Sequence, residues 1–96
     1  MIDDIQLFED GARGRYELSL DGGPAAVLTF KRLTPETIVI DHTGVPEVYR
    51  GRGVALLLMT RAVEDARRNG LKIIPECSYA AVQFKRHADW ADILAT

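Results

Sequence analysis

The chain has 96 residues, which is enough for one domain near the small end of those that bury a core of their own. Its formal net charge of −2 does not indicate a general nucleic-acid binder, and its one cysteine, Cys77, excludes an internal disulfide and a cysteine-based zinc cluster. The longest apolar run, residues 54–59, is far too short to cross a bilayer, and the acidic N-terminus is unlike a secretory signal. We therefore expect one domain over residues 1–96, located in the cytoplasm, without a membrane or nucleic-acid partner.

The first half of the chain predicts an antiparallel meander. Residues 15–20 alternate between apolar and polar types, as a half-buried strand does. Turn residues at 21–24 lead into a second strand, residues 25–33, and a turn at 34–36 leads into a third, residues 37–43. The third strand is rich in β-branched residues, which favour strands.

From Gly53 onward the pattern becomes helical, because apolar residues recur three and four positions apart. Basic residues and an Asn-Gly pair predict the end of this helix near residue 70. Residues 71–74 predict a short strand, and Ser78 is expected to cap a second helix with Ala81, Val82 and Phe84 buried. The tail is expected to pack Trp90 and Leu94 against the domain.

The third strand, the first helix and the fourth strand form a crossover, so these two strands should run parallel. We predict an α/β fold with a mixed antiparallel and parallel sheet of about four strands and helices packed on it. The sheet should splay between residues 37–43 and 71–74, where the pairing changes from antiparallel to parallel. The expected core includes Leu57, Leu58, Val63 and Ile73.

Residues 45–55 predict a phosphate-binding loop between a strand and a helix. Backbone N–H groups converge at such a loop, at the positive end of a helix dipole. Gly51 and Gly53 allow positive φ angles and close approach of a ligand to the backbone, and Arg50 and Arg52 add charge that suits a diphosphate. A tight turn with solvated arginines is the alternative interpretation.

Three motifs in chain order carry a resemblance to a known family: Arg50-x-x-Gly53-x-Ala55, then Pro75-x-Cys77-Ser78-Tyr79-Ala80, then Lys85-Arg86-His87-Ala88-Asp89-Trp90. Over about residues 13–94 the chain resembles the small, single-domain GNAT-like N-acetyltransferases. The resemblance implies a reduced GNAT-like fold and acetyl-CoA as co-substrate. It departs from the family pattern at Ala88, where proline is frequent.

The resemblance also implies roles for individual residues. The backbone around Val45 and Val48 should bind the pantetheine arm, and Lys85 and Arg86 should lie near the adenosine end. The pyrophosphate should be bound by the backbone N–H groups of the loop, namely those of Arg50, Gly51, Arg52, Gly53, Val54 and Ala55.

Cys77 and His42 are the candidates for the chemistry. Cys77 follows a strand end and precedes a helix, whose N-terminus favours a thiolate that could attack an acetyl group. The alternative is a small packed hydrophobe. His42 lies at the end of the neighbouring parallel strand and could activate Cys77 or accept a proton from an amine, or could simply be half-exposed. The larger relatives' tyrosine acid aligns with Lys85, so the general acid is open, and Tyr79 is the nearest phenol.

The sequence therefore predicts an acyltransferase that moves an acetyl group from acetyl-CoA to an amine, in a small molecule or a protein. No cluster has metal-ligand spacing, so no metal is expected. The alternative functions are a non-catalytic CoA- or acyl-CoA-binding module and an adaptor that uses a free sheet edge.

Overall fold

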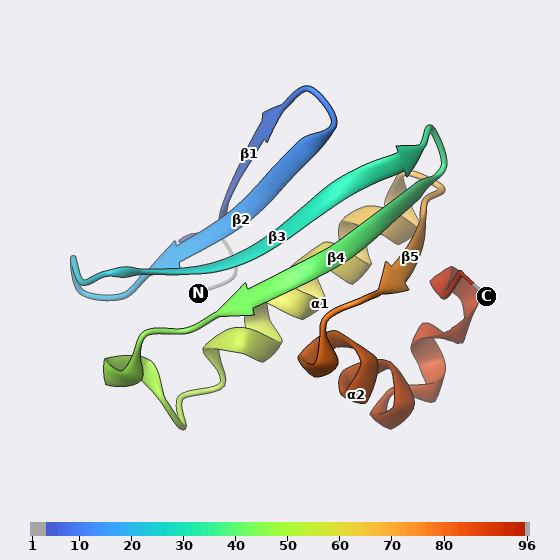
Figure 1. Cartoon of the computed structure of the whole chain (residues 1–96). Helices are drawn as coiled ribbons and strands as arrows, with labels where there is room; N and C mark the ends of the chain where they lie inside the picture. Colours follow the sequence, from blue (N-terminus) through green and yellow to red (C-terminus); the bar gives the residue numbers. More distant parts are fainter. Residues whose placement is uncertain (1–3, 96) are drawn as a thin grey trace.

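The computed structural model describes residues 4–95, and five strands form one mixed sheet in chain order (Figure 1). The strands are β1 (Gln6–Asp10), β2 (Arg13–Ser19), β3 (Ala25–Thr34), β4 (Thr37–Gly44) and β5 (Lys72–Pro75). β1 to β4 pair antiparallel with their neighbours, and β5 pairs parallel with β4. The expected mixed α/β fold is confirmed.

The strand that the sequence does not predict is β1. All five of its residues are exposed, including Leu7 and Phe8. A half-buried strand is recognised in a sequence by alternating apolar and polar residues. An edge strand that is exposed on both faces needs no such alternation. Backbone pairing with β2 holds β1 in place.

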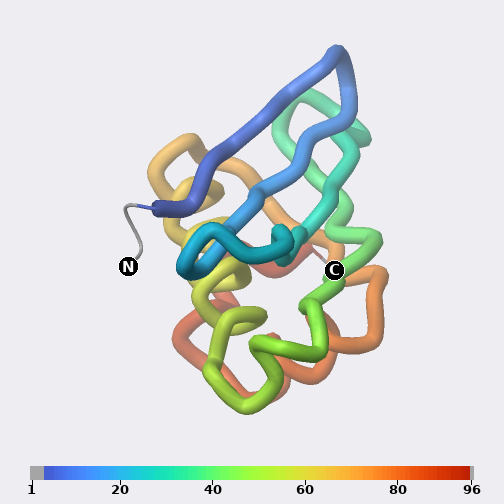
Figure 2. Tube along the Cα trace, turned by 90° about the vertical axis from the view of Figure 1, so that its left-hand side faces the viewer, coloured from blue at the N-terminus to red at the C-terminus, as the bar shows by residue number. Residues whose placement is uncertain are grey.

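Helix α1 (Val54–Arg68) lies against one face of the sheet, as the two views agree (Figures 1 and 2). Leu58 and Val63 on this helix and Ile73 on β5 are buried, as expected. Leu57 is only partly buried and packs at the border of the core. We call the sheet face that meets α1 the inner face and the opposite one the outer face.

Helix α2 (Ser78–Arg86) differs from the prediction in two ways. Its N-cap is Cys77 rather than Ser78, because the Cys77 sulfur accepts a hydrogen bond from the Ala80 N–H at 3.4 Å. Its buried positions are Ala80, Gln83 and Phe84, whereas Val82 is 42% exposed. The short helix thus buries positions i, i+3 and i+4 counted from Ala80.

The last helix within residues 4–95 is a 3₁₀ helix, η3 (Ala88–Ile93), which packs beside α1 and α2. Trp90 is buried, as predicted, and Leu94 is partly buried against the core. The guanidinium of Arg67 binds the Asp92 carboxylate at 2.8 and 2.9 Å. No helix within residues 4–95 is long and apolar enough to cross a membrane.

A buried carboxylate, Asp65, ties α1 to the sheet. The phenol of Tyr16 on β2 donates to it at 2.8 Å, and Arg61 and Arg68 each donate to it at 3.0 Å. Burial of Tyr16 and its hydrogen bond to Asp65 raise the pKa of that phenol far above its ordinary value. Because every member has a partner, the network stabilises the helix–sheet contact rather than offering a reactive group.

Candidate functional site

The sheet opens between β4 and β5 at Ile40. Parallel pairing runs from Thr37 opposite Lys72 to Ile40 opposite Pro75 and ends there, while β4 continues to Gly44. The Ile40 carbonyl accepts hydrogen bonds from the next two N–H groups after β5, those of Glu76 (3.0 Å) and Cys77 (3.1 Å). The predicted splay is therefore present, and it lies over the last four residues of β4.

A β-bulge marks the same point in β4. Phe30 on β3 pairs with Ile40 and Thr29 pairs with His42, so Asp41 is an extra residue with no β3 residue directly opposite it in the register. The Asp41 carboxylate accepts a hydrogen bond from the Thr29 hydroxyl at 2.6 Å. Bulges bend a strand and redirect its side chains. The bend here falls where β4 loses its contact with β5.

The loop after β4 leads through a short 3₁₀ helix, η2 (Glu47–Tyr49), into α1. A hollow of about 280 Å³ lies at this junction, bordered by the end of β4, the loop, the first turn of α1 and the start of α2. Its lining residues are Val45, Tyr49, Arg50, Gly51, Gly53, Val54, Ala55, Leu56 and Tyr79. Most of the loop residues predicted to bind a cofactor are thus brought to one hollow.

Backbone N–H groups at this hollow are free to bind an anion. Gly51 and Gly53 have φ angles of 79° and 73°, a left-handed conformation that favours glycine. Within residues 4–95, neither of their N–H groups has a hydrogen-bond partner, and no side chain caps the first turn of α1. The N–H groups of Arg50 and Arg52 are already bonded to the carbonyls of Glu47 and Tyr49. The expected set of donors over residues 50–55 is therefore reduced by these two.

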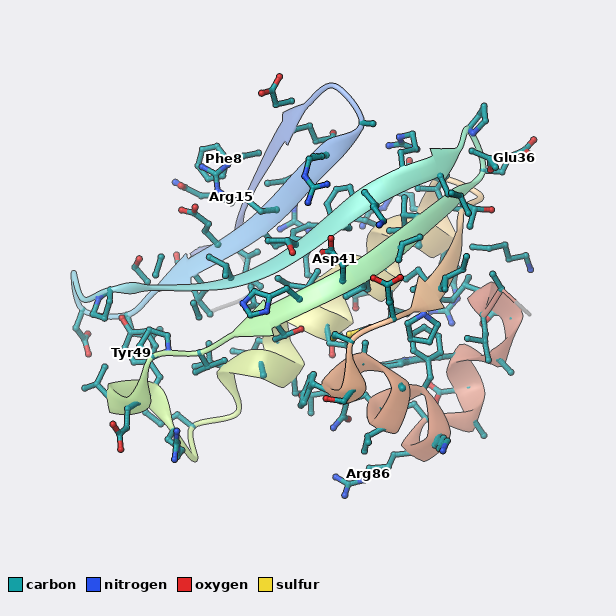
Figure 3. The ribbon with its side chains drawn as sticks, viewed as in Figure 1. Phe8, Arg15, Glu36, Asp41, Tyr49 and Arg86 are labelled. Atoms are coloured by element: carbon teal, nitrogen blue, oxygen red, sulfur yellow. The ribbon has the colours of Figure 1, made fainter. Side chains whose placement is uncertain are left out.

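The charged side chains predicted for the cofactor are solvent-exposed. Arg50 and Arg52 project from the loop, and Val48 is 66% exposed and does not line the hollow. Lys85 and Arg86 are exposed at the end of α2, and Arg86 points away from the sheet (Figure 3). Neither of these two lines the hollow.

Tyr49 anchors the loop to the turn between β2 and β3. Its side chain is buried and lies between the loop and that turn (Figure 3). The phenol oxygen accepts a hydrogen bond from the Leu20 N–H (2.9 Å), and its O–H donates toward the carbonyls of Pro24 (2.7 Å) and Leu20 (3.1 Å). The sequence does not indicate this role, because nothing local links Tyr49 to a turn about 25 residues earlier.

Cys77 lies at the opening, where its sulfur contacts the side chain of Thr43. The Thr43 hydroxyl is 3.5 Å from the Cys77 sulfur. Thr43 pairs with the fully buried Leu28, so it is on the inner face of β4. His42 pairs with Thr29, is exposed and lies on the outer face. The structure therefore brings Thr43, which the sequence analysis missed, to Cys77 and does not bring His42 there.

Two further ring side chains have defined surroundings. Tyr79 on α2 lines the hollow, and burial raises the pKa of its phenol, against a smaller lowering by Arg86. His87 stacks on Trp90 with ring centroids 4.0 Å apart and contacts the Gln83 carbonyl through Nδ1 at 2.8 Å. Tyr79 is thus at the candidate site, whereas His87 has a structural environment.

The chain is similar to proteins of one family. The sequence model of the GCN5-related N-acetyl-transferase family matches residues 15–93. Protein NATD1 of Xenopus tropicalis and of Homo sapiens are each 32% identical over 76 residues, which cover 78% of this chain and 70% and 67% of theirs. The solution structure of a GCN5-like protein from Staphylococcus aureus superposes with a TM-score of 0.68 at 29% identity, covering 96% of this chain and 89% of that one.

The family match agrees with the geometry of the opened sheet and the glycine loop. Proteins of the matched family are acyltransferases that transfer acetyl groups and generally use acetyl-CoA as co-substrate. The chain belongs to the GCN5-related N-acetyl-transferase family.

Proposed function

We propose that this protein is an acetyl-CoA-dependent N-acetyltransferase that moves an acetyl group to an amine. The observation that carries the proposal is the loop at the N-terminus of α1, where Gly51 and Gly53 present unbonded N–H groups beside the opening of the sheet. A helix N-terminus with free N–H groups stabilises phosphate charge. The pyrophosphate of acetyl-CoA would bind there, with Arg50 and Arg52 adding charge from the rim.

The pantetheine arm would run from the loop along the free end of β4. Val45 lines the hollow, and within residues 4–95 neither its N–H nor its carbonyl has a hydrogen-bond partner. These groups suit the amides of pantetheine. The arm would then direct the thioester toward the place where β4 and β5 separate, which is where Cys77 lies. Val48, Lys85 and Arg86 are more exposed and would contribute only at the outside of the bound molecule.

For the chemistry we propose transfer through Cys77. After the thiol has lost its proton to solvent, the thiolate would attack the thioester carbonyl carbon and the carbon–sulfur bond to CoA would break. The CoA sulfur would leave with the electron pair and take up a proton from solvent. The Thr43 hydroxyl and the N-terminus of α2 would stabilise the thiolate. Tyr79 would donate a hydrogen bond to the departing sulfur, since its raised pKa keeps the phenol protonated at neutral pH.

The acceptor amine would then attack the acetyl carbon on Cys77, releasing the thiolate and losing a proton from nitrogen. We assign the acceptance of that proton to His42, because an amine that enters the opening of the sheet from the outer face of β4 would meet this exposed ring. His42 would thus act on the amine rather than on the thiol. Its position on the face opposite Thr43 does not support a role in activating the Cys77 thiol.

The same separation supports the second candidate, a CoA- or acyl-CoA-binding module that does not turn over. The loop that would hold the cofactor has its glycines and free N–H groups in place, whereas Cys77 contacts Thr43 on the inner face of β4 and His42 lies on the outer face. Such a module would bind acetyl-CoA without consuming it.

Calorimetric titration with acetyl-CoA and with CoA tests the cofactor site, and mass spectrometry after mixing with acetyl-CoA tests for an acetyl group on the peptide that contains Cys77. Binding together with acetylated Cys77, released when a primary amine is added, is the expected result. Binding without any transfer would favour the module, and absence of binding would overturn both candidates.

A further inference from the structure

We infer that Tyr49 is a positioning residue: by anchoring the glycine loop to the β2–β3 turn, it holds the backbone of residues 50–53 in the geometry that binds an anion. The inference rests on the proposed acetyl-CoA site and adds to it a residue whose polar group does not face the ligand. The phenol oxygen is bonded to the backbone of Leu20 and Pro24, on the side away from the loop (Figure 3).

The Tyr49 side chain fits closely against the β2–β3 turn. Tyr49 is 3% exposed, and a Cβ atom built on Gly23 would lie only 2.7 Å from the phenol oxygen. Gly23 therefore leaves the space that the hydroxyl occupies. The backbone of the turn supplies this hydroxyl with one donor, the Leu20 N–H, and two acceptors, the carbonyls of Leu20 and Pro24.

The anchor is also coupled directly to the loop. The Tyr49 carbonyl accepts the hydrogen bond of the Arg52 N–H at 3.1 Å, so a shift of Tyr49 moves the peptide between the two glycines. Gly51 and Gly53 have no side chain that could hold the loop by packing, and their conformational freedom is large. Rigidity of this segment must come from outside it. A pre-ordered loop loses less entropy on binding, which raises affinity.

Tyr49→Phe is the first test, because phenylalanine keeps the buried ring and removes only the hydroxyl. We expect acetyl-CoA to bind about tenfold more weakly, with the rate at saturating acetyl-CoA unchanged. In the ligand-free protein, the NMR order parameters of the Gly51 and Gly53 amides should fall from the rigid value of about 0.85 to about 0.6.

Tyr16→Phe is the matched control. Tyr16 is equally buried, and its phenol also makes a hydrogen bond, to Asp65 in the second half of α1, but it does not touch the loop. The Tyr16→Phe variant should have a lower melting temperature, but its affinity for acetyl-CoA and the order parameters of Gly51 and Gly53 should equal those of the parent. An equal loss of affinity in Tyr16→Phe would mean that general destabilisation is responsible, and would overturn the inference.

Gly23→Ala provides a second variant from the turn itself. The added methyl group would lie 2.7 Å from the Tyr49 hydroxyl and 3.1 Å from the Leu20 carbonyl oxygen, so we expect the hydroxyl to shift. Gly23→Ala should therefore weaken acetyl-CoA binding although Gly23 does not line the hollow. In the double variant with Tyr49→Phe the clash with the hydroxyl is gone, so the double variant should bind no more weakly than Tyr49→Phe alone. Additive losses would overturn the coupling between the turn and the loop.

The two proposals can fail separately. If the parent protein does not bind acetyl-CoA, the proposed function is wrong, and the order parameters of Gly51 and Gly53 still decide whether Tyr49 fixes the loop. If the parent binds acetyl-CoA and Tyr49→Phe binds it equally well with a rigid loop, the proposed function stands and Tyr49 is only a packing residue.

Discussion

The hydroxyl of Thr43 lies 3.5 Å from the sulfur of Cys77, and this contact joins the free end of β4 to the N-cap of α2. The two residues come from segments that part at Ile40, so they face each other across the opening of the sheet. The same sulfur accepts a hydrogen bond from the Ala80 N–H. Cys77 thus has a structural role in addition to the chemical one proposed for it.

The two roles of Cys77 are separated by substituting serine and alanine. Cys77→Ser keeps a side chain that caps a helix well and removes the thiolate, whereas Cys77→Ala removes both. We expect both variants to lose acetyl transfer while binding acetyl-CoA almost as the parent does, with a loss of about 1 kcal/mol in stability for alanine only. Thr43→Val should slow acetylation of Cys77 without removing it. Full turnover in Cys77→Ser would exclude the covalent step and leave direct transfer to a bound amine.

Substitution of His42 should affect only one of the two proposed steps, which are acetylation of Cys77 and transfer of the acetyl group from Cys77 to the amine. Since it is exposed on the outer face of β4, His42→Ala should leave acetylation of Cys77 as in the parent. Transfer from acetylated Cys77 to an amine should slow by roughly 10²–10⁴, the scale of a lost general base. Rapid mixing with quenching and mass analysis measures the two steps separately. A slower first step would instead indicate that His42 acts on the thiol, and two unchanged steps would remove it from the mechanism.

Gly53 should be required for acetyl-CoA binding more than for folding. It has a φ angle of 73° and open space where a Cβ would lie, so the cost of Gly53→Ala to stability is the backbone cost of about 1–2 kcal/mol. Gly70, at the other end of α1, has a φ angle of 70° and equally open space. Gly70→Ala is therefore the control for that backbone cost.

We expect Gly53→Ala to weaken acetyl-CoA binding by tenfold or more, about 1.4 kcal/mol, and Gly53→Val to weaken it further because valine is bulkier. Gly70→Ala should lose similar stability and bind as the parent does. Calorimetry and thermal unfolding on the same samples measure both quantities. If the two alanine variants bind alike, the phosphate-loop interpretation is wrong.

The ion pair between Arg67 and Asp92 should make stability depend on pH in acid. The Arg67 guanidinium holds the pKa of the Asp92 carboxyl below its ordinary value. A carboxyl with a lowered folded-state pKa stabilises the protein above its unfolded pKa of about 3.9, and this contribution is lost as pH falls through the folded pKa. Asp92→Asn should lower the melting temperature near pH 7 and reduce its fall in acid.

Asp89→Asn is the control, since Asp89 meets Arg67 through its main-chain carbonyl, which the substitution retains. It should change the acid dependence of the melting temperature less than Asp92→Asn does. Melting curves between about pH 7 and pH 2 for the parent and both variants make the comparison. Parallel pH profiles for the parent and Asp92→Asn would show that the exposed pair contributes nothing measurable.

Local sequence patterns were sufficient for the parts of the site that are local. The helical spacing from Val54 and the β-branched run before it predicted a crossover between two parallel strands. The structure has this crossover, and the sheet opens between β4 and β5 as predicted. Gly51 and Gly53 predicted a loop with positive φ angles, and both have them. These features depend on the conformational preferences of a few consecutive residues, so they can be read from the sequence.

The faces of β4 could not be read in the same way. Counting every second residue from the buried Ile38 and Ile40 puts His42 on the inner face, beside Cys77. The bulge at Asp41 adds one residue, so that His42 moves to the outer face and Thr43 to the inner one. A bulge is set by pairing with β3, including the hydrogen bond from Thr29 to Asp41, and no local signal in β4 predicts it.

The sequence by itself thus determined the order of the main elements, the crossover and the glycine loop, because each follows from backbone preference or apolar spacing over a short stretch. Only the tertiary structure decided which residues meet across the opening and what holds the loop. Thr43 reaches Cys77 across 34 positions, and Tyr49 reaches Pro24 across 25. Such contacts depend on how strands pair and pack, and side chains far apart in the chain carry no mark of their partners.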